Sequence, residues 1–483
     1  MPRLLEKTAS LCPTCLKALP AEIWELDDEA GVVVLNRVCD EHGAFSTVIW
    51  RGEPSFQAWR RPKKPLKVKA QTAKNLGCPL DCGLCPDHGQ NPCTVLLELT
   101  DRCDLGCPVC FANSGTTAGF DQPFDKLLTA LTWIHKTAGQ VVLQLSGGEP
   151  TLYPRLPAIV AAARKLFPAV QLNTNGLSLA QDPDLAQALA QNGLSWVFLQ
   201  FDGLKDETYV ALRGRPLLAA KLKAILACEK AGLAVVLVPT VAKGVNDQEL
   251  ADLVEWARLR PIIRGIHVQP LTQTGRQGLS GEEYRLTLPE TIKALGAGPT
   301  GFLRPSWAFP PGCEHERCSF HFRFRRLSDG RLIPKVPQSD DCGCGPLGCP
   351  PKATTKPTTP LETDLNRTKA VEVIIQSWGG PKSAAAVSSP GQEPLGSNSL
   401  NAPQKSPAVA IPMAKKTQTL DDFLAQATRE TFSVTGMVFQ DRHNMDLARL
   451  KGCCVHIYQE PQRLIPFCAM NLTAANGRGP YRG

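Results

Sequence analysis

Three closely spaced cysteines carry the sharpest chemical signal in the sequence. Cys103, Cys107 and Cys110 follow directly after a short apolar run that ends at Thr100. Iron–sulfur clusters are ligated by closely spaced cysteine thiolates, so one tight loop can hold three corners of a [4Fe–4S] cube. The fourth iron then stays open for a substrate or cofactor, as in other metal sites whose protein shell is incomplete. The spacing alone also fits a structural zinc knuckle.

A glycine-rich motif ends the next apolar run. It reads Ser-Gly-Gly-Glu-Pro and contains Gly147, Gly148, Glu149 and Pro150. Two glycines permit close backbone approach, and a carboxylate accepts hydrogen bonds from an ammonium group, so the motif suits an amino-acid-like ligand. The same residues also make an ordinary turn, but their place one unit after the cysteines favours binding. Later runs end in polar residues of the kind that also form plain turns: Asn173, Asn175, Gln200 and Asp202.

The chain contains nineteen cysteines, and most of the sixteen others also group by spacing. Cys12, Cys15 and Cys39 suit a mononuclear tetrahedral zinc or rubredoxin-like iron site, with His42 as one conceivable fourth ligand. A second group repeats the three-cysteine spacing and is followed by a cysteine able to complete a closed cluster: Cys78, Cys82, Cys85 and Cys93. A third group joins two cysteines of the middle region to the tail: Cys313, Cys318, Cys453, Cys454 and Cys468. We therefore expect one or two auxiliary [4Fe–4S] clusters.

Alternating strands and helices must position these motifs. Apolar runs predict strands at Thr94–Thr100, Val141–Ser146, Ala169–Asn173, Ser195–Phe201, Leu233–Thr240 and Gly265–Pro270. Apolar residues at three- and four-residue intervals predict helices at Asp125–Ala138, Leu156–Phe167, Pro183–Asn192, Leu217–Ala231 and Asp247–Leu259. This alternation predicts a parallel sheet, whose ligands bind at the carboxyl ends of its strands. Periodicity does not distinguish an open doubly wound sheet from a partial barrel.

Length and composition limit the class of protein. The chain has 483 residues, 43% of them apolar and 20% charged, so most of it should fold and two or more domains are expected. Its formal charge of +8 does not demand nucleic acid. Residues 1–20 lack the apolar core of a secretory signal, and no apolar stretch approaches the length needed to cross a bilayer. We expect a cytoplasmic protein in a reducing compartment, with peripheral contact at the inner membrane face left open.

The chain divides by pattern into six segments. A metal ribbon at 1–59 precedes a basic connector with a cysteine cluster at 60–93 and the strand–helix core at 94–275. A cysteine-containing auxiliary region at 276–349 is followed by a linker at 350–417, rich in Ser, Ala, Pro and Gly and expected to be disordered. A cysteine-containing segment at 418–483, with a helix starting near Thr419, is expected to fold back onto the main body.

The loop Cys-x3-Cys-x2-Cys after the first strand and the Gly-Gly-Glu-Pro stretch after the second resemble the hallmark of the radical S-adenosylmethionine superfamily. The resemblance covers Thr94 to about Gly275 and implies a partial (β/α)6 TIM-like barrel. It implies that S-adenosylmethionine chelates the open iron and is cleaved to a 5′-deoxyadenosyl radical, which abstracts hydrogen from an sp3 carbon. By position it assigns Cys103, Cys107 and Cys110 to the cluster, and the residues from Gly147 to Glu149 to the methionine end of the cofactor. It also implies that the four later polar residues face the ribose or the substrate: Asn173, Asn175, Gln200 and Asp202.

A narrower resemblance extends to both ends of the chain. The run Cys-Pro-Val-Cys-Phe-Ala, the ribbon cysteines, the second cysteine group and the tail are similar to a group that contains tetraether lipid synthases and radical pterin methyltransferases. It implies a radical enzyme that joins two lipid chains through a carbon–carbon bond, or one that transfers methyl groups to a pterin or another small molecule. Either would need an electron donor such as ferredoxin or flavodoxin. The alternative from another class is a zinc-ribbon nucleic-acid-binding protein, which the ordered motifs on a strand–helix series disfavour.

Overall fold

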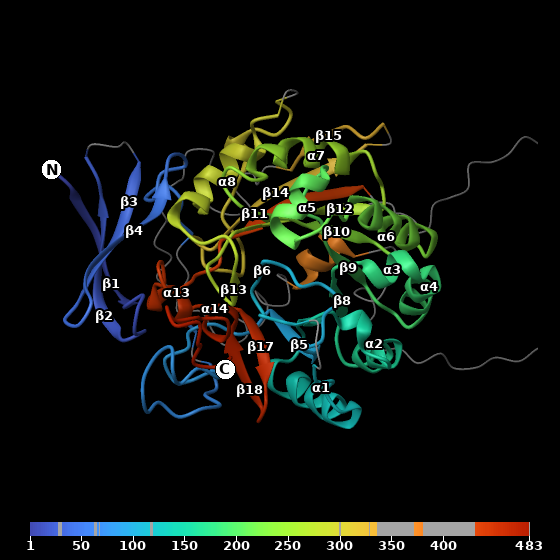
Figure 1. Ribbon diagram of the computed structural model, residues 1–483, viewed down its shortest axis with the longest axis horizontal. Coiled ribbons are helices and arrows are strands. Elements are labelled where there is room, and N and C mark those ends of the chain that lie inside the picture. Colours follow the sequence, from blue (N-terminus) through green and yellow to red (C-terminus); the bar gives the residue numbers. More distant parts are fainter. Residues whose placement is uncertain are drawn as a thin grey trace, which may run out of the picture.

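The computed structural model describes residues 1–27, 31–61, 65–66, 68–115, 119–298, 301–327, 329–335, 371–379 and 430–482. Its N-terminal part is a four-stranded antiparallel sheet, drawn in blue in Figure 1, with the order β1-β2-β3-β4. The strands are β1 (Arg3–Leu11), β2 (Ala18–Glu25), β3 (Val32–Cys39) and β4 (Gly43–Arg51). One face buries alternate side chains such as Ile23, Leu35 and Trp50, as a half-buried strand does. Within this ribbon, only the apolar run Gly31–Val38 predicts a strand from the sequence, and it corresponds to β3.

The predicted strand–helix series is present as a parallel sheet. Its strands are β5 (Thr94–Thr100), β7 (Val142–Gly147), β8 (Ala169–Thr174), β9 (Trp196–Gln200), β10 (Val235–Val238) and β12 (Ile263–Pro270). Each pairs in parallel with the next one along the chain. The short strand β11 (Thr240–Val241) also pairs with β12. The carboxyl ends of all six strands therefore meet at one edge, where the two sequence motifs lie.

Helices cover the outer face of this sheet, because alternate strand residues there are apolar. The helices are α1 (Phe124–Ala138), α2 (Leu156–Arg164), α3 (Leu177–Gln181), α4 (Pro183–Gln191), α5 (Asp206–Arg213), α6 (Leu218–Lys230) and α7 (Leu250–Arg258). In α1, Leu127, Leu131 and Ile134 follow the three- and four-residue spacing of one buried helical face. The five predicted helices correspond to α1, α2, α4, α6 and α7. The short helices α3 and α5 were not predicted.

The C-terminal segment adds a strand to each edge of this sheet. Strand β16 (Thr431–Met437) pairs in parallel with β12, and β17 (Val455–Gln459) pairs in parallel with β5. The tail, drawn in red in Figure 1, thus reaches both edges of the core. Beyond these strands, β14 (Ser319–Arg326), β15 (Leu332–Pro334) and β18 (Arg463–Pro466) pair antiparallel. Along the resulting order from β15 to β18 the outermost strands do not pair, so the barrel is partial, as expected.

A short helix over residues 371–378 corrects one prediction. These residues fall in the segment 350–417 that we expected to be a disordered linker, yet Val371 and Ile375 are buried. They pack on inward-facing residues of the sheet such as Val142 and Val236. The reason is an apolar face at helical spacing inside a polar, low-complexity segment. The rest of that segment and the helix expected near Thr419 lie outside the described residues.

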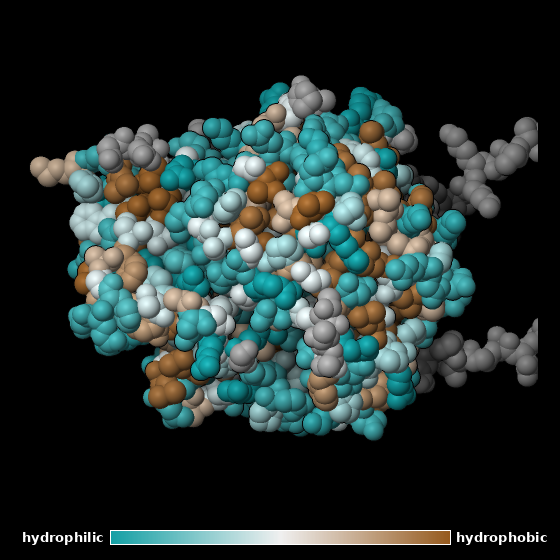
Figure 2. All heavy atoms as spheres, viewed as in Figure 1, coloured by the Kyte–Doolittle hydropathy of each residue, from teal (hydrophilic) through white to brown (hydrophobic). Residues whose placement is uncertain are grey.

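The remaining elements are short and connect the larger ones. They are β6 (Val109–Cys110), β13 (Arg276–Gln277), α8 (Leu288–Leu295), α13 (Leu447–Lys451), α14 (Phe467–Met470), and the single turns η1 (Pro150–Leu152), η2 (Asp247–Glu249), η3 (Glu282–Tyr284) and η4 (Pro305–Trp307). On the face in Figure 2, hydrophilic residues cover most of the surface and hydrophobic ones occur in separate patches. Within the described ranges, no helix combines the length and apolar character needed to span a membrane.

Candidate active site and metal centres

A cavity of about 290 Å³ lies at the carboxyl ends of the parallel strands. Its wall contains the three cysteines of the first motif and most of the residues predicted to bind a cofactor: Cys103, Cys107, Cys110, Gly147, Gly148, Glu149, Asn173, Asn175 and Gln200. Pro150 and Asp202 are not part of the wall. The structure thus brings the two sequence motifs together around one space, as their positions after successive strands predict.

Two arginines from outside the cysteine loop hold its backbone. Arg276 donates to the carbonyl oxygen of Cys107 at 2.6 Å, and Arg213 donates to that of Val109 at 3.2 Å. The loop strand β6 also pairs with β13. Burial raises the pKa of the Cys103 thiol to about 12 and also raises the pKa of Cys107. Three thiols that face one cavity from a braced loop fit three corners of a [4Fe–4S] cluster.

The glycines of the second motif serve close backbone packing. Gly148 N–H donates to the Thr100 carbonyl oxygen at 2.7 Å, and Glu149 N–H donates to that of Arg102, also at 2.7 Å. A Cβ added at Gly148 would stand 2.2 Å from the Arg102 oxygen, and one at Gly147 would stand 2.2 Å from the Thr100 oxygen. Only glycine lets the end of β7 lie against the start of the cysteine loop.

The carboxylate of Glu149 ties β7 to β8. It accepts hydrogen bonds from Thr151 Oγ1 at 2.6 Å, Thr174 Oγ1 at 2.7 Å and the backbone N–H of Asn175 at 2.7 Å. Burial raises the pKa of Glu149, while these hydrogen bonds act to lower it. The side chain is 1% exposed. Glu149 therefore has a structural task in addition to its place in the cavity wall, and its expected contact with an ammonium group stays a prediction.

Two buried cations that the sequence patterns did not single out support the same wall. Arg213 makes a bidentate pair with Asp202, at 2.8 Å and 2.7 Å, and donates to Thr240 Oγ1 at 2.8 Å. Lys221 donates to the Asn175 carbonyl oxygen at 2.5 Å and to Gln200 Oε1 at 2.9 Å. The sequence feature that could have identified Lys221 is its position, because this charged residue shares the buried face of α6 with apolar residues. Such a residue is almost never fully buried unless it is paired.

An amide network crosses the inner face of the sheet. Trp196 Nε1 donates to Gln171 Oε1 at 2.9 Å, Gln171 Nε2 donates to Asn173 Oδ1 at 2.6 Å, and Asn173 Nδ2 donates to Gln144 Oε1 at 3.2 Å. Asn173 and Gln144 line the cavity. The predicted cofactor residue Asn173 is therefore fixed in orientation by its neighbours, which makes this part of the wall polar and rigid.

The far wall of the cavity is built from elements outside the predicted core. Strands β12, β14 and β16 contribute His267, His321, Arg323 and Thr435, and the helix at 371–378 contributes Trp378. Glu314 lies in the same wall, with its Oε2 atom 3.8 Å from His321 Nε2. Burial lowers the pKa of His267 to about 4, so its imidazole is neutral near pH 7. Sequence reasoning missed this wall because its residues come from four separated segments.

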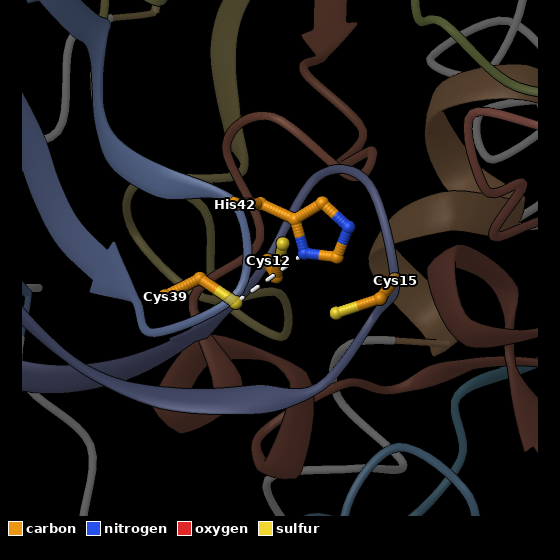
Figure 3. A group of neighbouring side chains, drawn as sticks. All are labelled: Cys12, Cys15, Cys39 and His42. Atoms are coloured by element: carbon orange, nitrogen blue, oxygen red, sulfur yellow. Dashed lines mark hydrogen bonds between the residues drawn. The ribbon is translucent and has the colours of Figure 1, made fainter.

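The ribbon brings together its predicted ligands, including the proposed fourth one. The side chains of Cys12, Cys15, Cys39 and His42 point toward one another (Figure 3). Their ligand atoms all lie within 4.8 Å of one another. A hydrogen bond between Cys39 Sγ and His42 Nδ1 spans 3.5 Å and lowers the pKa of Cys39 to about 7. Three thiols and one imidazole in this arrangement fit a mononuclear tetrahedral zinc or iron ion.

The auxiliary cysteines gather where the tail meets the core. The sulfur atoms of Cys93, Cys313 and Cys454 lie within 4.8 Å of one another. Cys93 thus neighbours the third predicted group rather than completing the second. Backbone bonding explains this, since the Cys93 and Thr94 N–H groups both donate to the Cys454 carbonyl oxygen at the start of β17 and β5.

Two further cysteine groups lie near this one. Cys318, Cys453 and Cys468 line a separate small cavity of about 30 Å³, where Arg449 donates to Cys318 Sγ at 3.2 Å. The neighbouring Cys78 thiol and burial both raise the pKa of Cys82, so these two cysteines of the second predicted group lie close together. The hydroxyl of Tyr481 accepts from Cys82 N–H at 2.9 Å and donates to Pro79 O at 2.7 Å. The folded-back tail therefore contacts each of the three auxiliary cysteine groups that lie within the described residues, and these thiol sets suit auxiliary metal centres.

Comparisons with known proteins find related families, sequences and structures. Residues 97–257 match the radical SAM superfamily, and residues 4–51 match the HMPTM N-terminal zinc ribbon domain. The chain is 28% identical over 257 residues to the GTP 3′,8-cyclase of Helicobacter pylori, covering 50% of this chain and 79% of that protein. Among solved structures, SuiB of Streptococcus suis bound to its precursor peptide SuiA is 18% identical with a TM-score of 0.37, covering 44% of this chain and 46% of that one.

One relative aligns over nearly the whole chain. The 7,8-dihydro-6-hydroxymethylpterin dimethyltransferase of Methanocaldococcus jannaschii is 30% identical over 485 residues, which cover 96% of this chain and 93% of that protein. The alignment therefore includes the ribbon, the strand–helix core and most of the tail. The chain belongs to the radical S-adenosylmethionine superfamily, in the family of this pterin dimethyltransferase.

Proposed function

We propose that this radical S-adenosylmethionine enzyme transfers methyl groups to a reduced pterin. The proposal takes its substrate class from the name of the relative aligned over 96% of the chain. The observation that carries it is a set of polar side chains in a mostly apolar cavity lining, among them the amides of Gln144 and Asn173 and the imidazole of His267. A mostly apolar pocket with a few placed polar groups suits a small flat heterocycle with several hydrogen-bonding atoms.

Membership of the superfamily implies a [4Fe–4S] cluster and S-adenosylmethionine. Together these groups supply a carbon-centred radical able to remove hydrogen from an unactivated carbon. We assign the ligation of the cluster to Cys103, Cys107 and Cys110, which face the cavity from one loop. The methionine end of the cofactor would lie against the backbone of Gly147 and Gly148, next to that loop. One-electron reduction by ferredoxin or flavodoxin stays a prediction.

The tail residues have a defined part in this function. Between β16 and β17 the chain runs along the cavity and contributes Phe439 and Gln440 to its wall. Phe439 stacks on Phe467 with ring centroids 4.3 Å apart, and Phe467 contacts Phe111 of the cysteine loop at 5.3 Å. These three rings add apolar surface to the cavity wall beside the cysteine loop, and we expect them to limit the entry of water there. Exclusion of water protects a reactive intermediate from side reactions.

Lipid-chain coupling, the first function expected from the sequence, makes a different demand on the cavity. Two long hydrocarbon chains need an apolar channel, whereas burying unpaired amides and charges against hydrocarbon is costly. The aromatic residues of the tail offer an apolar side, but the opposite wall carries polar groups from β7, β8, β12 and β14. These polar groups in the lining support the pterin over the lipid chains as substrate.

Expression in a bacterial host that makes unmethylated 6-hydroxymethyl-7,8-dihydropterin tests the proposal. Cells that produce the full chain without oxygen should accumulate pterins heavier by one or two methyl groups, detected by mass spectrometry of extracts. The host supplies the methyl donor and the reductant. Cys103→Ala, which removes one proposed cluster ligand, should abolish these products. Unchanged pterins alongside altered membrane lipids would replace this function with lipid coupling.

A further inference from the structure

We propose that the helix at 371–378 is the floor of the substrate cavity, at the end opposite the cysteine loop, and that Trp378 sets its depth. This floor admits a pterin whose 2-amino group is free and excludes one that carries a bulky group there. The inference rests on the pterin methyltransferase function and names the residue that limits the size of the substrate.

The helix packs against the amino-terminal ends of the parallel strands. Its residues Val371 and Ile375 are buried in one cluster with side chains at or near the starts of β7, β8, β9 and β10: Val142, Ala169, Trp196, Ala234 and Val236. The glycine motif lies at the other end, since β7 runs from Val142 to Gly147. At about 3.3 Å per residue, this strand separates the two ends by about 16 Å. The helix therefore closes the end of the barrel interior that is remote from the cysteine loop.

Trp378 crosses the interior from this helix and is held on several sides. Its ring centroid lies 5.0 Å from that of Phe198 on β9 and 5.9 Å from that of His267 on β12. Its Nε1 atom donates to Ser433 Oγ of β16 at 3.0 Å, and Ser433 is buried. Trp378 also lines the cavity, as Ile374 of the same helix does. A fixed ring thus faces the space that a ligand would occupy.

The chemistry of the substrate decides which of its ends meets this floor. Hydrogen must be removed from an sp3 carbon, and 6-hydroxymethyl-7,8-dihydropterin has only two, the ring carbon at position 7 and the hydroxymethyl carbon. Both belong to the pyrazine end of the molecule, which must therefore face the cysteine loop. The pyrimidine end, with its 2-amino group, then points away from the loop and toward Trp378.

The floor acts on the substrate through size. The Trp378 ring cannot move aside without losing its hydrogen bond to Ser433 and its contacts with Phe198 and His267. Close-packed interiors accommodate added atoms poorly, because neighbouring side chains are forced out of their preferred conformations. A bulky group on the 2-amino nitrogen would meet the ring, whereas a free amino group would not.

Two ligands and one cavity variant test this inference. The full chain with its metal centres reconstituted is dialysed to equilibrium without oxygen against 6-hydroxymethyl-7,8-dihydropterin or against the same compound with a benzyl group on its 2-amino nitrogen. The wild type should prefer the unsubstituted compound by about tenfold or more. In Trp378→Ala the benzyl group can occupy the vacated apolar space. This variant should therefore bind the benzyl compound about tenfold or more tightly than the wild type does, and should lose the preference.

Two further variants complete the comparison. Trp378→Phe keeps a smaller ring at the same place and should show an intermediate preference, which decides the question if Trp378→Ala does not retain its metal centres. Trp133→Ala removes the same side chain from α1, outside the cavity, where the Trp133 ring lies 5.7 Å from that of Tyr458. It should keep the preference of the wild type. Equal iron content shows which of the variants are intact.

Three results would contradict the inference, and they separate it from the function on which it rests. A wild type that prefers the unsubstituted compound, together with intact Trp378 variants that keep the same preference, would overturn the role of Trp378 and leave the function standing. A wild type that binds both compounds equally would do the same. A wild type that binds neither compound would overturn both.

Discussion

At the scale of single residues, the buried side chains of Arg213 and Asp202 neutralise each other's charge beside the cavity. Arg213 and Asp202 have side chains 7% and 0% exposed and share two hydrogen bonds. Arg213 also bonds to the cysteine loop and to Thr240. A buried ion pair is a weak source of net stability, but removing one partner leaves an uncompensated charge. The pair therefore couples the ends of β9 and β11 to the loop that carries the cysteines.

A double-variant comparison tests this coupling. Arg213→Gln should lower the free energy of unfolding by about 3–5 kcal/mol, since Asp202 is left charged in a buried place. Adding Asp202→Asn removes that charge, so the double variant should regain a large part of the loss. Chemical denaturation measures the unfolding free energies of Arg213→Gln, Asp202→Asn and the double variant. If the two single losses simply add in the double variant, the ion pair is not the reason for the destabilisation.

The ammonium group of Lys221 gives stability a pH dependence. Burial lowers its pKa to about 8 from a model-compound value of 10.5. Between these values the unfolded chain holds a proton that the folded chain has released, so this group makes folding more favourable as pH rises. The unfolding free energy of the wild type minus that of Lys221→Met should therefore rise from pH 8 to about pH 10.5, by about 3 kcal/mol at most. A difference that is constant over this window would contradict the burial of a charged amine.

The sequence identified the residues of the cysteine loop and the glycine motif because their order and spacing are local. Arg213, Lys221 and Glu314 were not identified, since a single charged residue in a helix or loop has an ordinary solvent-exposed interpretation. The partner of each lies far along the chain or in another element. Cys93 was assigned to the wrong neighbours for the same reason, because the pairing of β17 with β5 decides its surroundings.

At the scale of elements, the close contact between the end of β7 and the cysteine loop is possible because Gly148 has no side chain. Gly148→Ala would set a methyl group 2.2 Å from a backbone oxygen of Arg102, and backbone is a poor place to relieve such a clash. We expect a destabilisation of about 1–3 kcal/mol and a loss of iron equivalent to one cluster, because the cysteine loop must move. Iron and sulfide analysis after reconstitution measures the second effect. Gly312→Ala is the control, since a Cβ there meets nothing within 4 Å.

Elements with a regular period were predictable and elements with a mixed pattern were not. Strands β5 to β12 and the longer helices follow apolar spacing, and the structure places them as expected. The helix at 371–378 has its apolar face inside a segment of low complexity, which hid it. Strands β16 and β17 lie in a tail whose cysteines drew attention to metal rather than to a sheet, and their parallel pairing with β12 and β5 is not local information.

At the scale of the whole molecule, the C-terminal segment 430–482 is an integral part of the central sheet, because it adds one strand to each edge of the parallel core. The tail is paired at both edges of the parallel sheet and lines the cavity between them. Its Asp441 carboxylate is fully buried, accepts from Gln273 N–H at 2.9 Å and pairs with Arg285 at 3.1 Å. These contacts fasten the crossing between β16 and β17 to the core.

Hydrogen exchange followed by mass spectrometry tests this integration without altering the chain. Strand β16 lies between β14 and β12, and β17 lies between β5 and β18, so each is hydrogen-bonded on both sides. Their amides should therefore exchange as slowly as those of β5 and β12. The ribbon, which forms a separate sheet, should show its own protection level. Fast exchange in β16 and β17 together with slow exchange in the core would show that the tail is a loosely attached extension.

The most direct test of the central claim is the formation of 5′-deoxyadenosine by the anaerobically reconstituted full chain, measured with and without a reduced pterin. The account predicts formation under a strong reductant, a clear increase when 6-hydroxymethyl-7,8-dihydropterin is added, and none with Cys103→Ala. No 5′-deoxyadenosine from a wild-type chain that carries iron and sulfide, or a rate indifferent to the pterin, would contradict it.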